Sequence, residues 1–389
     1  MIKPALLCVL ALTAPVLDAA GARGGKGVRY PAEQKTFLAE ESGWEVIQVT
    51  TDPADDSGLY FTSHSFVPED HGLVFTSRRT GAWNLYYLDL RTFAFVQLTD
   101  GKAIAGTGAD VCAATREVFY RDGNLVKAVS LTTLKERTIT TVPEGYSVGA
   151  AVSVTDAGDT VAFSISEKIH VATKTDVIYS DMNERFTKRP WSAVMIGRAD
   201  GTGWHERARQ KKWISHVIMS PTNPDLTLYC HEGRWDQVEQ RMWLVSAAGN
   251  RPLRPEETPA LSIGHEYWFP DGIHVGYQAT YPKKAKMIGV ADTRDGSYRE
   301  YPTEFFDGHT QVSHDGRWFV GDGKESAPYL NLYHLVEGKL TGRHVFRHGS
   351  LFSQQHWHPH PAFSPDDRYV LFTSSRAGNG DVYLLRVKK

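Results

Sequence analysis

Histidines are concentrated in one short segment near the C-terminus. His356, His358 and His360 alternate there with Trp357 and Pro359. In a regular strand, side chains two residues apart project from one face, so the three imidazoles would point the same way. Imidazoles at this density serve mainly as metal ligands or proton carriers, and the proline favours an edge or rim position. The segment therefore indicates a metal site, although core packing would also accommodate single histidines.

Three further histidines lie in a similar place relative to a turn. His216, His265 and His309 each precede a turn rich in Pro, Asp, Ser or Gly by several residues, as His360 precedes Ser364–Asp367. If the chain repeats one structural unit, residues at the same phase of consecutive units face a common axis. The sequence thus predicts several imidazoles around one centre. The competing interpretation is that each imidazole satisfies a local backbone group.

Two more segments could contribute to this centre. His231 and Glu232 lie at the end of a predicted strand, and Arg241 opens the next one, Arg241–Val245. The planar guanidinium of an arginine suits a carboxylate ligand. The same side chain would serve equally well in an ion pair with an acid on a neighbouring unit, and the sequence leaves both interpretations open.

The elements that carry these residues form a repeat. A Ser/Pro/Asp/Gly turn, a β-rich strand, a loop and an aromatic-aliphatic strand recur most clearly at Phe363–Ser374 with Asp381–Val387, and at Gly72–Ser77 with Asn84–Leu90. Weaker copies begin near Glu117, Thr160, Leu226, Gly272 and Arg317. Seven copies of roughly 46 residues are typical of one all-β fold, the seven-bladed β-propeller with four-stranded antiparallel blades. Two β-sandwiches are the alternative.

Closure of such a ring usually needs a blade built from both ends of the chain. The strand Trp44–Thr50 is expected to complete the last blade beside Val382–Val387, which removes two open sheet edges. Helical patterns are scarce, and the only candidates, 181–188 and 204–212, are weak. No linker divides residues 23–389, which we expect to form a single domain.

Composition limits the function classes. The chain has 389 residues, with 43 basic against 45 acidic side chains and a net charge of -2, so nucleic acid is not an expected partner. Membrane insertion is not expected either, because no internal apolar run reaches the ~18 residues of a membrane helix.

The N-terminus predicts export. Residues 1–22 have the pattern of a secretory signal peptide, with Lys3, the apolar stretch Ala5–Val16 and small residues after it. We therefore expect a periplasmic or secreted protein. Its remaining cysteines, Cys112 and Cys230, could pair in an oxidising compartment, but two unpaired buried thiols are the simpler interpretation.

Four local motifs resemble the oligogalacturonate lyases, a family of seven-bladed propellers. In chain order they are His231-Glu-Gly with Arg241-Met-Trp243, Gly264-His-Glu-Tyr-Trp-Phe-Pro-Asp-Gly272, His309 ahead of Phe319–Gly323, and Gln355-x-x-His-Pro-His360 followed by Phe-Ser-Pro-Asp-Asp. The last motif is the most specific, and the resemblance extends over most of the chain. Tyr60–Phe66, which includes His64, matches only loosely. Family members are typically cytoplasmic, whereas this chain is predicted to be exported.

The resemblance implies roles for individual residues. Family members hold Mn²⁺ with three histidines and a glutamine, which correspond here to His309, Gln355, His358 and His360. The family's base corresponds to His265 and its arginine beside the substrate to Arg241. Further candidates for substrate binding are His216, His231 and His64. The implied substrate is an acidic oligosaccharide, a galacturonide or a related uronate, and the oligomeric state stays open.

These residue types suit β-elimination from a uronate. Removal of the C5 proton builds negative charge beside a carboxylate, which a divalent cation and an arginine can stabilise while a neutral histidine takes the proton. Neither a Gly-x-Ser-x-Gly elbow nor a paired-carboxylate motif for hydrolysis occurs in the sequence. The alternative is a non-catalytic, TolB-like propeller that binds a protein partner, but such a scaffold needs no set of histidines directed at one point.

Overall fold

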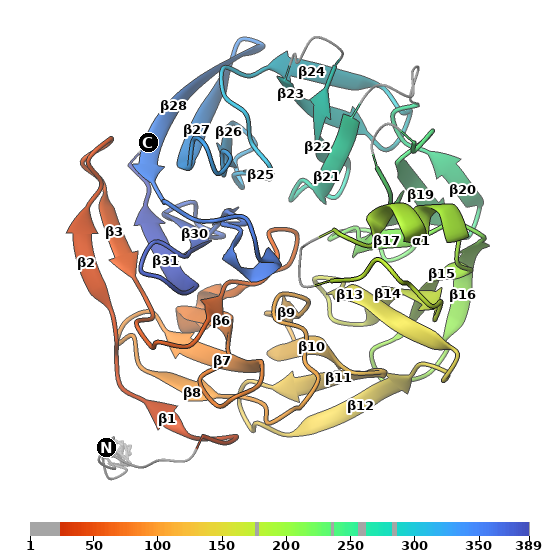
Figure 1. Cartoon of the computed structure of the whole chain (residues 1–389), viewed down its shortest axis with the longest axis horizontal. Helices are drawn as coiled ribbons and strands as arrows, with labels where there is room; N and C mark the ends of the chain where they lie inside the picture. The colour runs from red at the N-terminus through yellow and green to blue at the C-terminus, as the bar shows by residue number, and fades with distance from the viewer. Residues whose placement is uncertain (1–23, 176–178, 235–236, 256–261, 282–285, 389) are drawn as a thin grey trace, which may run out of the picture.

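Seven antiparallel sheets surround a central axis, as a computed structural model of the chain shows (Figure 1). The structure describes residues 24–388 except 176–178, 235–236, 256–261 and 282–285. The predicted signal peptide lies outside the described residues. The seven-bladed β-propeller expected from the repeat is confirmed, and the sandwich alternative is wrong.

Five blades are plain four-stranded meanders, and their first strands lie nearest the axis (Figure 1). Their strands, in chain order, are β9 (Asp110–Cys112), β10 (Glu117–Asp122), β11 (Leu125–Ser130) and β12 (Glu136–Thr141); β13 (Tyr146–Val154), β14 (Thr160–Glu167), β15 (Ser192–Arg198) and β16 (His205–Gln210); β17 (Ile214–Met219), β18 (Thr227–His231), β19 (Met242–Ser246) and β20 (Gly249–Pro252); β21 (Ser262–Trp268), β22 (His274–Thr280), β23 (Lys286–Asp292) and β24 (Tyr298–Pro302); and β25 (Thr310–Val312), β26 (Trp318–Gly321), β27 (Tyr329–Val336) and β28 (Lys339–Arg347).

The other two blades contain the N-terminal strands. One has the order β1-β8-β7-β6-β4, with β5 also paired to β6, and the other has the order β2-β3-β31-β30-β29. Their bounds are β1 (Arg29–Tyr30), β2 (Lys35–Leu38), β3 (Glu45–Gln48), β4 (Asp56–Ser57), β5 (Phe66–Val67), β6 (Gly72–Ser77), β7 (Asn84–Asp89), β8 (Phe95–Gln97), β29 (Ala362–Phe363), β30 (Tyr369–Ser374) and β31 (Asp381–Arg386).

Ring closure occurs where the sequence predicts it. Strand β3 pairs antiparallel with β31, with Val46 opposite Leu385 and Ile47 opposite Leu384. A strand from the start of the chain thereby covers the edge of the last blade, which would otherwise expose unpaired backbone groups.

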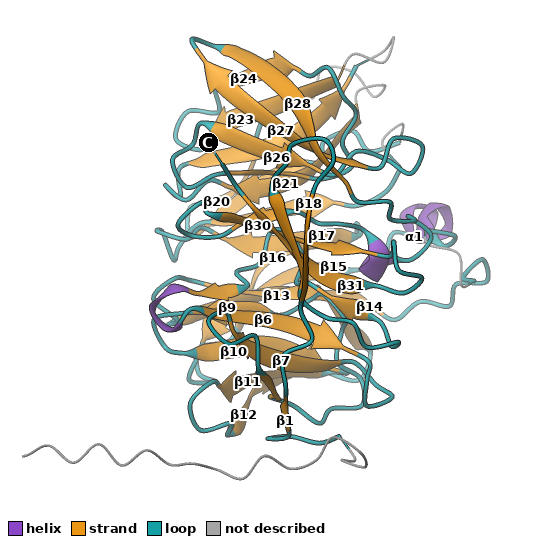
Figure 2. Cartoon of the chain, turned by 90° about the vertical axis from the view of Figure 1, so that its left-hand side faces the viewer, coloured by secondary structure: helices purple, strands orange, loops and turns teal. Residues whose placement is uncertain are grey.

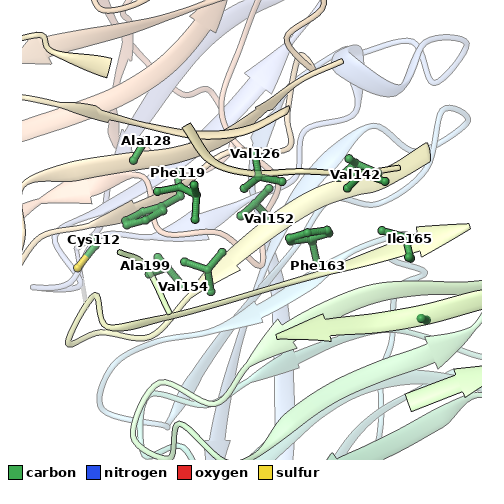
Figure 3. Close-up of a cluster of buried hydrophobic side chains, with 14 residues drawn as sticks. Cys112, Phe119, Val126, Ala128, Val142, Val152, Val154, Phe163, Ile165 and Ala199 are labelled. Atoms are coloured by element: carbon green, nitrogen blue, oxygen red, sulfur yellow. The ribbon is translucent and has the colours of Figure 1, made fainter. Parts of the chain in front are cut away.

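The hydrophobic core lies between neighbouring blades. Figure 3 shows one such cluster, in which Phe119 and Val126 from one sheet pack with Val152 and Phe163 from the next. Every residue of β6 is buried because both faces of this inner strand meet another blade, whereas every residue of the outer strand β20 is exposed. Full burial of a Val or Phe side chain is worth about 1.5–3 kcal/mol, so stacking of the blades stabilises the ring.

Helical structure is limited to α1 (Met182–Lys188) and two 3₁₀ turns, η1 (Pro68–Asp70) and η2 (Gln355–Trp357), in the described part of the chain. Helix α1 stands at one face of the ring (Figure 2) and contacts the β17–β20 blade, where the Arg185 guanidinium lies 5.7 Å from the centre of the Trp213 ring. The other weak helix candidate, 204–212, is wrong, because His205–Gln210 forms β16. Among the described residues, no helix is long and apolar enough to cross a membrane.

Candidate metal centre and catalytic cavity

Three histidines from two distant segments meet near the axis. His309 lies directly before β25, and His358 and His360 lie between η2 and β29. Each offers a ring nitrogen, and these three atoms lie within 4.8 Å of one another. All three side chains are buried. This is the arrangement that a single cation needs from three imidazole ligands.

Hydrogen bonds fix which nitrogens are available for a cation. His309 donates from Nδ1 to Asp322 Oδ2 at 2.7 Å, and His358 donates from Nε2 to the Phe352 carbonyl at 3.0 Å. The remaining nitrogens, His309 Nε2 and His358 Nδ1, are buried without a hydrogen-bond partner, as is His360 Nδ1. In His309 and His358 the hydrogen bond on the other side of the ring leaves a free lone pair, an arrangement typical of metal ligands.

Burial keeps these imidazoles neutral. Desolvation, followed by the charges of neighbouring histidines, holds the pKa of His309 and of His360 well below the usual value. Burial also lowers the pKa of His358. Neutral imidazole is the form that binds metal, so the cluster is prepared for a cation at neutral pH.

Gln355 borders the cluster from η2. Its amide Nε2 lies 3.2 Å from His360 Nε2, and its Oε1 accepts a hydrogen bond from the Tyr179 hydroxyl at 3.2 Å. Rotation of the amide by 180° exchanges its oxygen and nitrogen and presents the oxygen to the cluster. The structure therefore brings all four predicted ligands, His309, Gln355, His358 and His360, to one place.

His265 is the free imidazole beside this cluster. The centre of its ring lies 4.2 Å from that of His309, and its Nδ1 donates to Gln278 Oε1 at 3.2 Å, which leaves Nε2 as a proton acceptor. Burial, followed by the charges of His309 and Arg241, holds the pKa of His265 well below its usual value. A neutral, oriented imidazole next to a cation site is suited to general-base catalysis.

Bulges in the inner strands direct these side chains toward the axis. The register of β17 shifts between Ser215 and Ile218, and that of β21 shifts between Gly264 and Tyr267. His216 and His265 lie within these bulges in left-handed backbone conformations, with φ of 48° and 52°. His360 also has a positive φ, 45°. A bulge interrupts the alternation of side chains, and strained backbone of this kind is concentrated at functional sites.

The C-terminal histidine segment does not form the regular strand that would align all three of its rings. His356 belongs to η2, where its Nε2 lies 3.2 Å from Asp55 Oδ2, away from the cluster. Only His358 and His360 join His309. The prolines and the 3₁₀ turn break the two-residue periodicity on which the alignment depends.

Arg241 lies in a buried group of charges in the wall of the cavity. Its Nη1 donates to Glu232 Oε1 at 3.0 Å and its Nε donates to Glu266 Oε2 at 3.1 Å. Glu232 follows β18 of the same blade, whereas Glu266 belongs to β21 of the next. The two carboxylates hold the guanidinium in place, so its orientation does not depend on a ligand.

The remaining three candidates for substrate binding differ in position. His216 lines the cavity, but His231 and His64 are not among the lining residues. Two observations explain this. The His231 ring is buried 5.1 Å from that of Trp243, with its Nε2 on Gln210. The His64 side chain is half exposed and pairs with Asp110 at 3.1 Å, and the charge of this carboxylate raises the pKa of His64. Their proposed role in substrate binding stays a prediction, and neither side chain lines the cavity.

The cavity beside the cluster has a volume of about 640 Å³ and is lined by residues from several blades and from α1, including His265, Arg241, Gln355 and Tyr60. Sequence reasoning missed Tyr60, whose ring centre lies 4.7 Å from that of His360 and 5.7 Å from that of His216. Its segment matches the family only loosely, and a lone aromatic residue before a turn carries no chemical signal.

Asp322 was also missed, and it provides a first prediction. Replacement of Asp322 by asparagine should weaken Mn²⁺ binding by about 10–100-fold, because the carboxylate that orients His309 and favours its ligating form is lost. Equilibrium dialysis with metal analysis measures the effect. Asp315→Asn, an exposed site after β25, serves as the control. Unchanged affinity in Asp322→Asn would contradict the role of this carboxylate in orienting His309 as a ligand.

Fold and site together define a seven-bladed propeller with a histidine-rich cation site near its axis. The sequence model of the oligogalacturonate lyase family matches residues 24–389, and the chain belongs to that family.

Individual relatives agree with this assignment. The chain is 29% identical to the oligogalacturonide lyase of Pectobacterium atrosepticum over 391 residues, which cover 93% of this chain and 98% of that protein. It is 28% identical over the same shares to the oligogalacturonate lyase of Dickeya dadantii. Among solved structures, an oligogalacturonate lyase in complex with manganese superposes with a TM-score of 0.87 at 26% identity, covering 94% of this chain and 99% of that one. The oligogalacturonate lyase of Vibrio parahaemolyticus gives 0.86 at 25% identity, with the same coverage.

Proposed function

We propose that the protein cleaves oligogalacturonides, or closely related uronate oligosaccharides, by β-elimination to 4,5-unsaturated products. The observation that carries the proposal is the neutral His265, which lines the cavity and lies beside three converging imidazoles. Membership of the oligogalacturonate lyase family supports the same reaction. A TolB-like scaffold has no need for such a group, so the non-catalytic alternative is less well supported.

The donor set fits a divalent transition metal. Three neutral imidazoles with unpaired buried nitrogens, and an amide that can present oxygen, suit Mn²⁺ better than Ca²⁺ or Mg²⁺. A structurally similar family member was solved in complex with manganese. We therefore assign Mn²⁺ as the cofactor, with His309, Gln355, His358 and His360 as its ligands. Bound there, the cation supplies Lewis-acid stabilisation of negative charge that develops on the substrate carboxylate.

The remaining roles follow from position and charge. His265 Nε2 accepts the proton from C5 of the uronate, and the Nδ1 bond to Gln278 holds the ring in the required tautomer. Arg241 contributes fixed positive charge in the cavity wall, already oriented by Glu232 and Glu266. The electron pair released at C5 forms the 4,5 double bond, and the C4 oxygen leaves with the rest of the chain.

We also propose that the reaction takes place outside the cytoplasm. Lys3 and the apolar stretch Ala5–Val16 support export through a signal peptide, to the periplasm or the medium. Cell fractionation of the full-length chain, with N-terminal sequencing of the recovered protein, tests this. Recovery of uncleaved protein in the cytoplasm would refute it.

The direct test of the reaction is digestion of size-defined oligogalacturonides by the Mn²⁺-loaded protein. Each cleavage creates a double bond conjugated to a carboxylate, and the ultraviolet absorbance of the product should rise with time. Reduced oligogalacturonides of the same lengths, with uronate units converted to galactose units, are the control and should give no change. Protein with a full complement of metal that gives no new absorbance on any uronate oligomer would contradict the proposed function.

The activity should persist into mildly acidic solution. An ordinary histidine titrates near pH 6.5, but burial, followed by His309 and Arg241, holds the pKa of His265 well below that value. Since the neutral form is the base, activity is retained as the pH falls through 6.5 and is lost only at lower pH, where the ligands also protonate and release metal. Profiles of kcat/KM and of bound Mn²⁺ against pH measure this. An activity loss centred near 6.5 with metal retained would contradict it.

A further inference from the structure

A second cluster of metal-ligating side chains lies beside the same cavity, which two of its three members line. His216, Cys230 and Glu232 each offer one ligand atom, and these atoms lie within 4.8 Å of one another. His216 comes from the bulge in β17, Cys230 from β18, and Glu232 from the residue after β18. None of the three belongs to the group formed by His309, His358 and His360.

The distances within this cluster are close to those of a tetrahedral metal site. Glu232 Oε2 lies 3.6 Å from His216 Nε2 and 3.9 Å from Cys230 Sγ. With metal–nitrogen and metal–oxygen bonds of about 2.0–2.2 Å and a metal–sulfur bond of about 2.3 Å, neighbouring ligand atoms lie about 3.3–3.7 Å apart. Small side-chain rotations therefore suffice to close the site around an ion.

A fourth side chain orients the imidazole from behind. His216 Nδ1 lies 3.3 Å from Glu266 Oε1, and both atoms are buried without a hydrogen bond in the structure. Nε2 faces Glu232 while Nδ1 faces Glu266, so the ring stands between a ligand oxygen and an orienting carboxylate. His309 has the same arrangement, with Asp322 behind its Nδ1. Carboxylate–histidine pairs of this kind commonly accompany histidine ligands.

The charges in the cluster match a divalent cation. Arg241 donates hydrogen bonds to Glu232 Oε1 and Glu266 Oε2. The other oxygen of each carboxylate is directed to His216. Two carboxylates and a thiolate carry three negative charges, and Arg241 supplies one positive charge. A divalent ion supplies the other two, and the buried group becomes neutral when the ion displaces the Cys230 proton.

We propose that His216, Cys230 and Glu232 form a second cation site, distinct from the manganese centre and selective for thiophilic divalent ions such as Zn²⁺ and Cd²⁺. Sulfur and imidazole ligands favour such ions over Mn²⁺, whereas the cluster of three histidines and a glutamine contains no thiolate. The two sites should therefore prefer different ions, because their ligand atoms differ. Binding at the second site does not depend on the proposed lyase reaction.

The ultraviolet absorbance of a sulfur–cadmium bond reports on cadmium bound to the thiolate alone. Titration of the full, folded protein with Cd²⁺ should produce the ultraviolet absorbance of a sulfur–cadmium bond and a stoichiometry of two ions per chain. Cys230→Ser should lose this absorbance and bind one ion. Cys112→Ser is the matched control, because Cys112 is the other free, buried cysteine of the described residues, and it should behave like the wild type. His358→Ala should keep the absorbance, because only the first site is damaged.

Three results would overturn the second site: absence of the sulfur–cadmium absorbance in the wild-type protein, its persistence in Cys230→Ser, or its loss in Cys112→Ser. His216→Ala keeps the thiol and covers the case in which Cys230→Ser does not fold, and its Cd²⁺ affinity at this site should fall by about 100-fold or more. Unchanged affinity would overturn the assignment. Mn²⁺ binding and oligogalacturonide cleavage are measured separately, so failure of this site is distinguishable from failure of the lyase proposal.

Discussion

Replacement of His265 by alanine should abolish turnover while the protein keeps its manganese. The imidazole is neutral because burial holds its pKa well below the usual value, and its Nδ1 is occupied by Gln278, so Nε2 is oriented as a base. A positioned general base contributes about 10²–10⁴-fold to a rate, and kcat should fall at least by this factor. The measurements are initial rates on oligogalacturonides and metal content of the same samples.

The control for this variant is His274→Ala. His274 lies in the neighbouring strand β22 of the same blade, outside the cavity, and pairs with Asp271 at the surface. It should retain the wild-type rate. If His265→Ala kept full activity, the base would have to be another group. If it lost both activity and Mn²⁺, the imidazole would be a ligand and not the base.

Replacement of His358 by alanine should remove both manganese and activity. The side chain contributes one of three unpaired ring nitrogens, and its other nitrogen is fixed by the Phe352 carbonyl. Loss of one imidazole leaves two histidines and an amide. Removal of a residue that only hydrogen-bonds to a ligand lowers metal affinity by about 10–100-fold, so removal of a ligand should lower it further. Dialysis against Mn²⁺ and rate assays at saturating metal measure the two effects.

His356→Ala is the matched control for His358→Ala. The two histidines are two residues apart, but His356 pairs with Asp55 outside the cluster. This variant should keep both metal and turnover. Retention of stoichiometric Mn²⁺ by His358→Ala would mean that the ion binds elsewhere. Thermal unfolding of both variants without metal distinguishes loss of the site from loss of the fold.

The repeat allowed the ring to be predicted because each blade contributes its own copy of one pattern. Strand β3 could be assigned to the last blade because Trp44–Thr50 is β-rich and β31 otherwise lacks an outer partner. The strand His205–Gln210 was not separable from a weak helix, because its outward residues are charged and the local pattern is ambiguous. Tertiary pairing with β15 decides its conformation.

The proposed ligand set could be named from the sequence because dense histidines carry a chemical signal and because motifs of a similar family suggest their roles. The bulges at His216 and His265 were not, since a register shift depends on the partner strand and leaves no mark in one sequence. The same limitation explains His231. Its residue type and its place beside Glu232 suggest that His231 lines the cavity. The alternation of side chains along β18 instead turns its ring toward Trp243.

The most direct test of the central claim is anomalous diffraction from crystals grown with Mn²⁺, recorded on both sides of the manganese absorption edge. We expect one manganese peak in bonding contact with His309 Nε2, His358 Nδ1 and the His360 ring, with His265 outside its coordination sphere. A manganese peak at another place, or His265 among its ligands, would contradict the account.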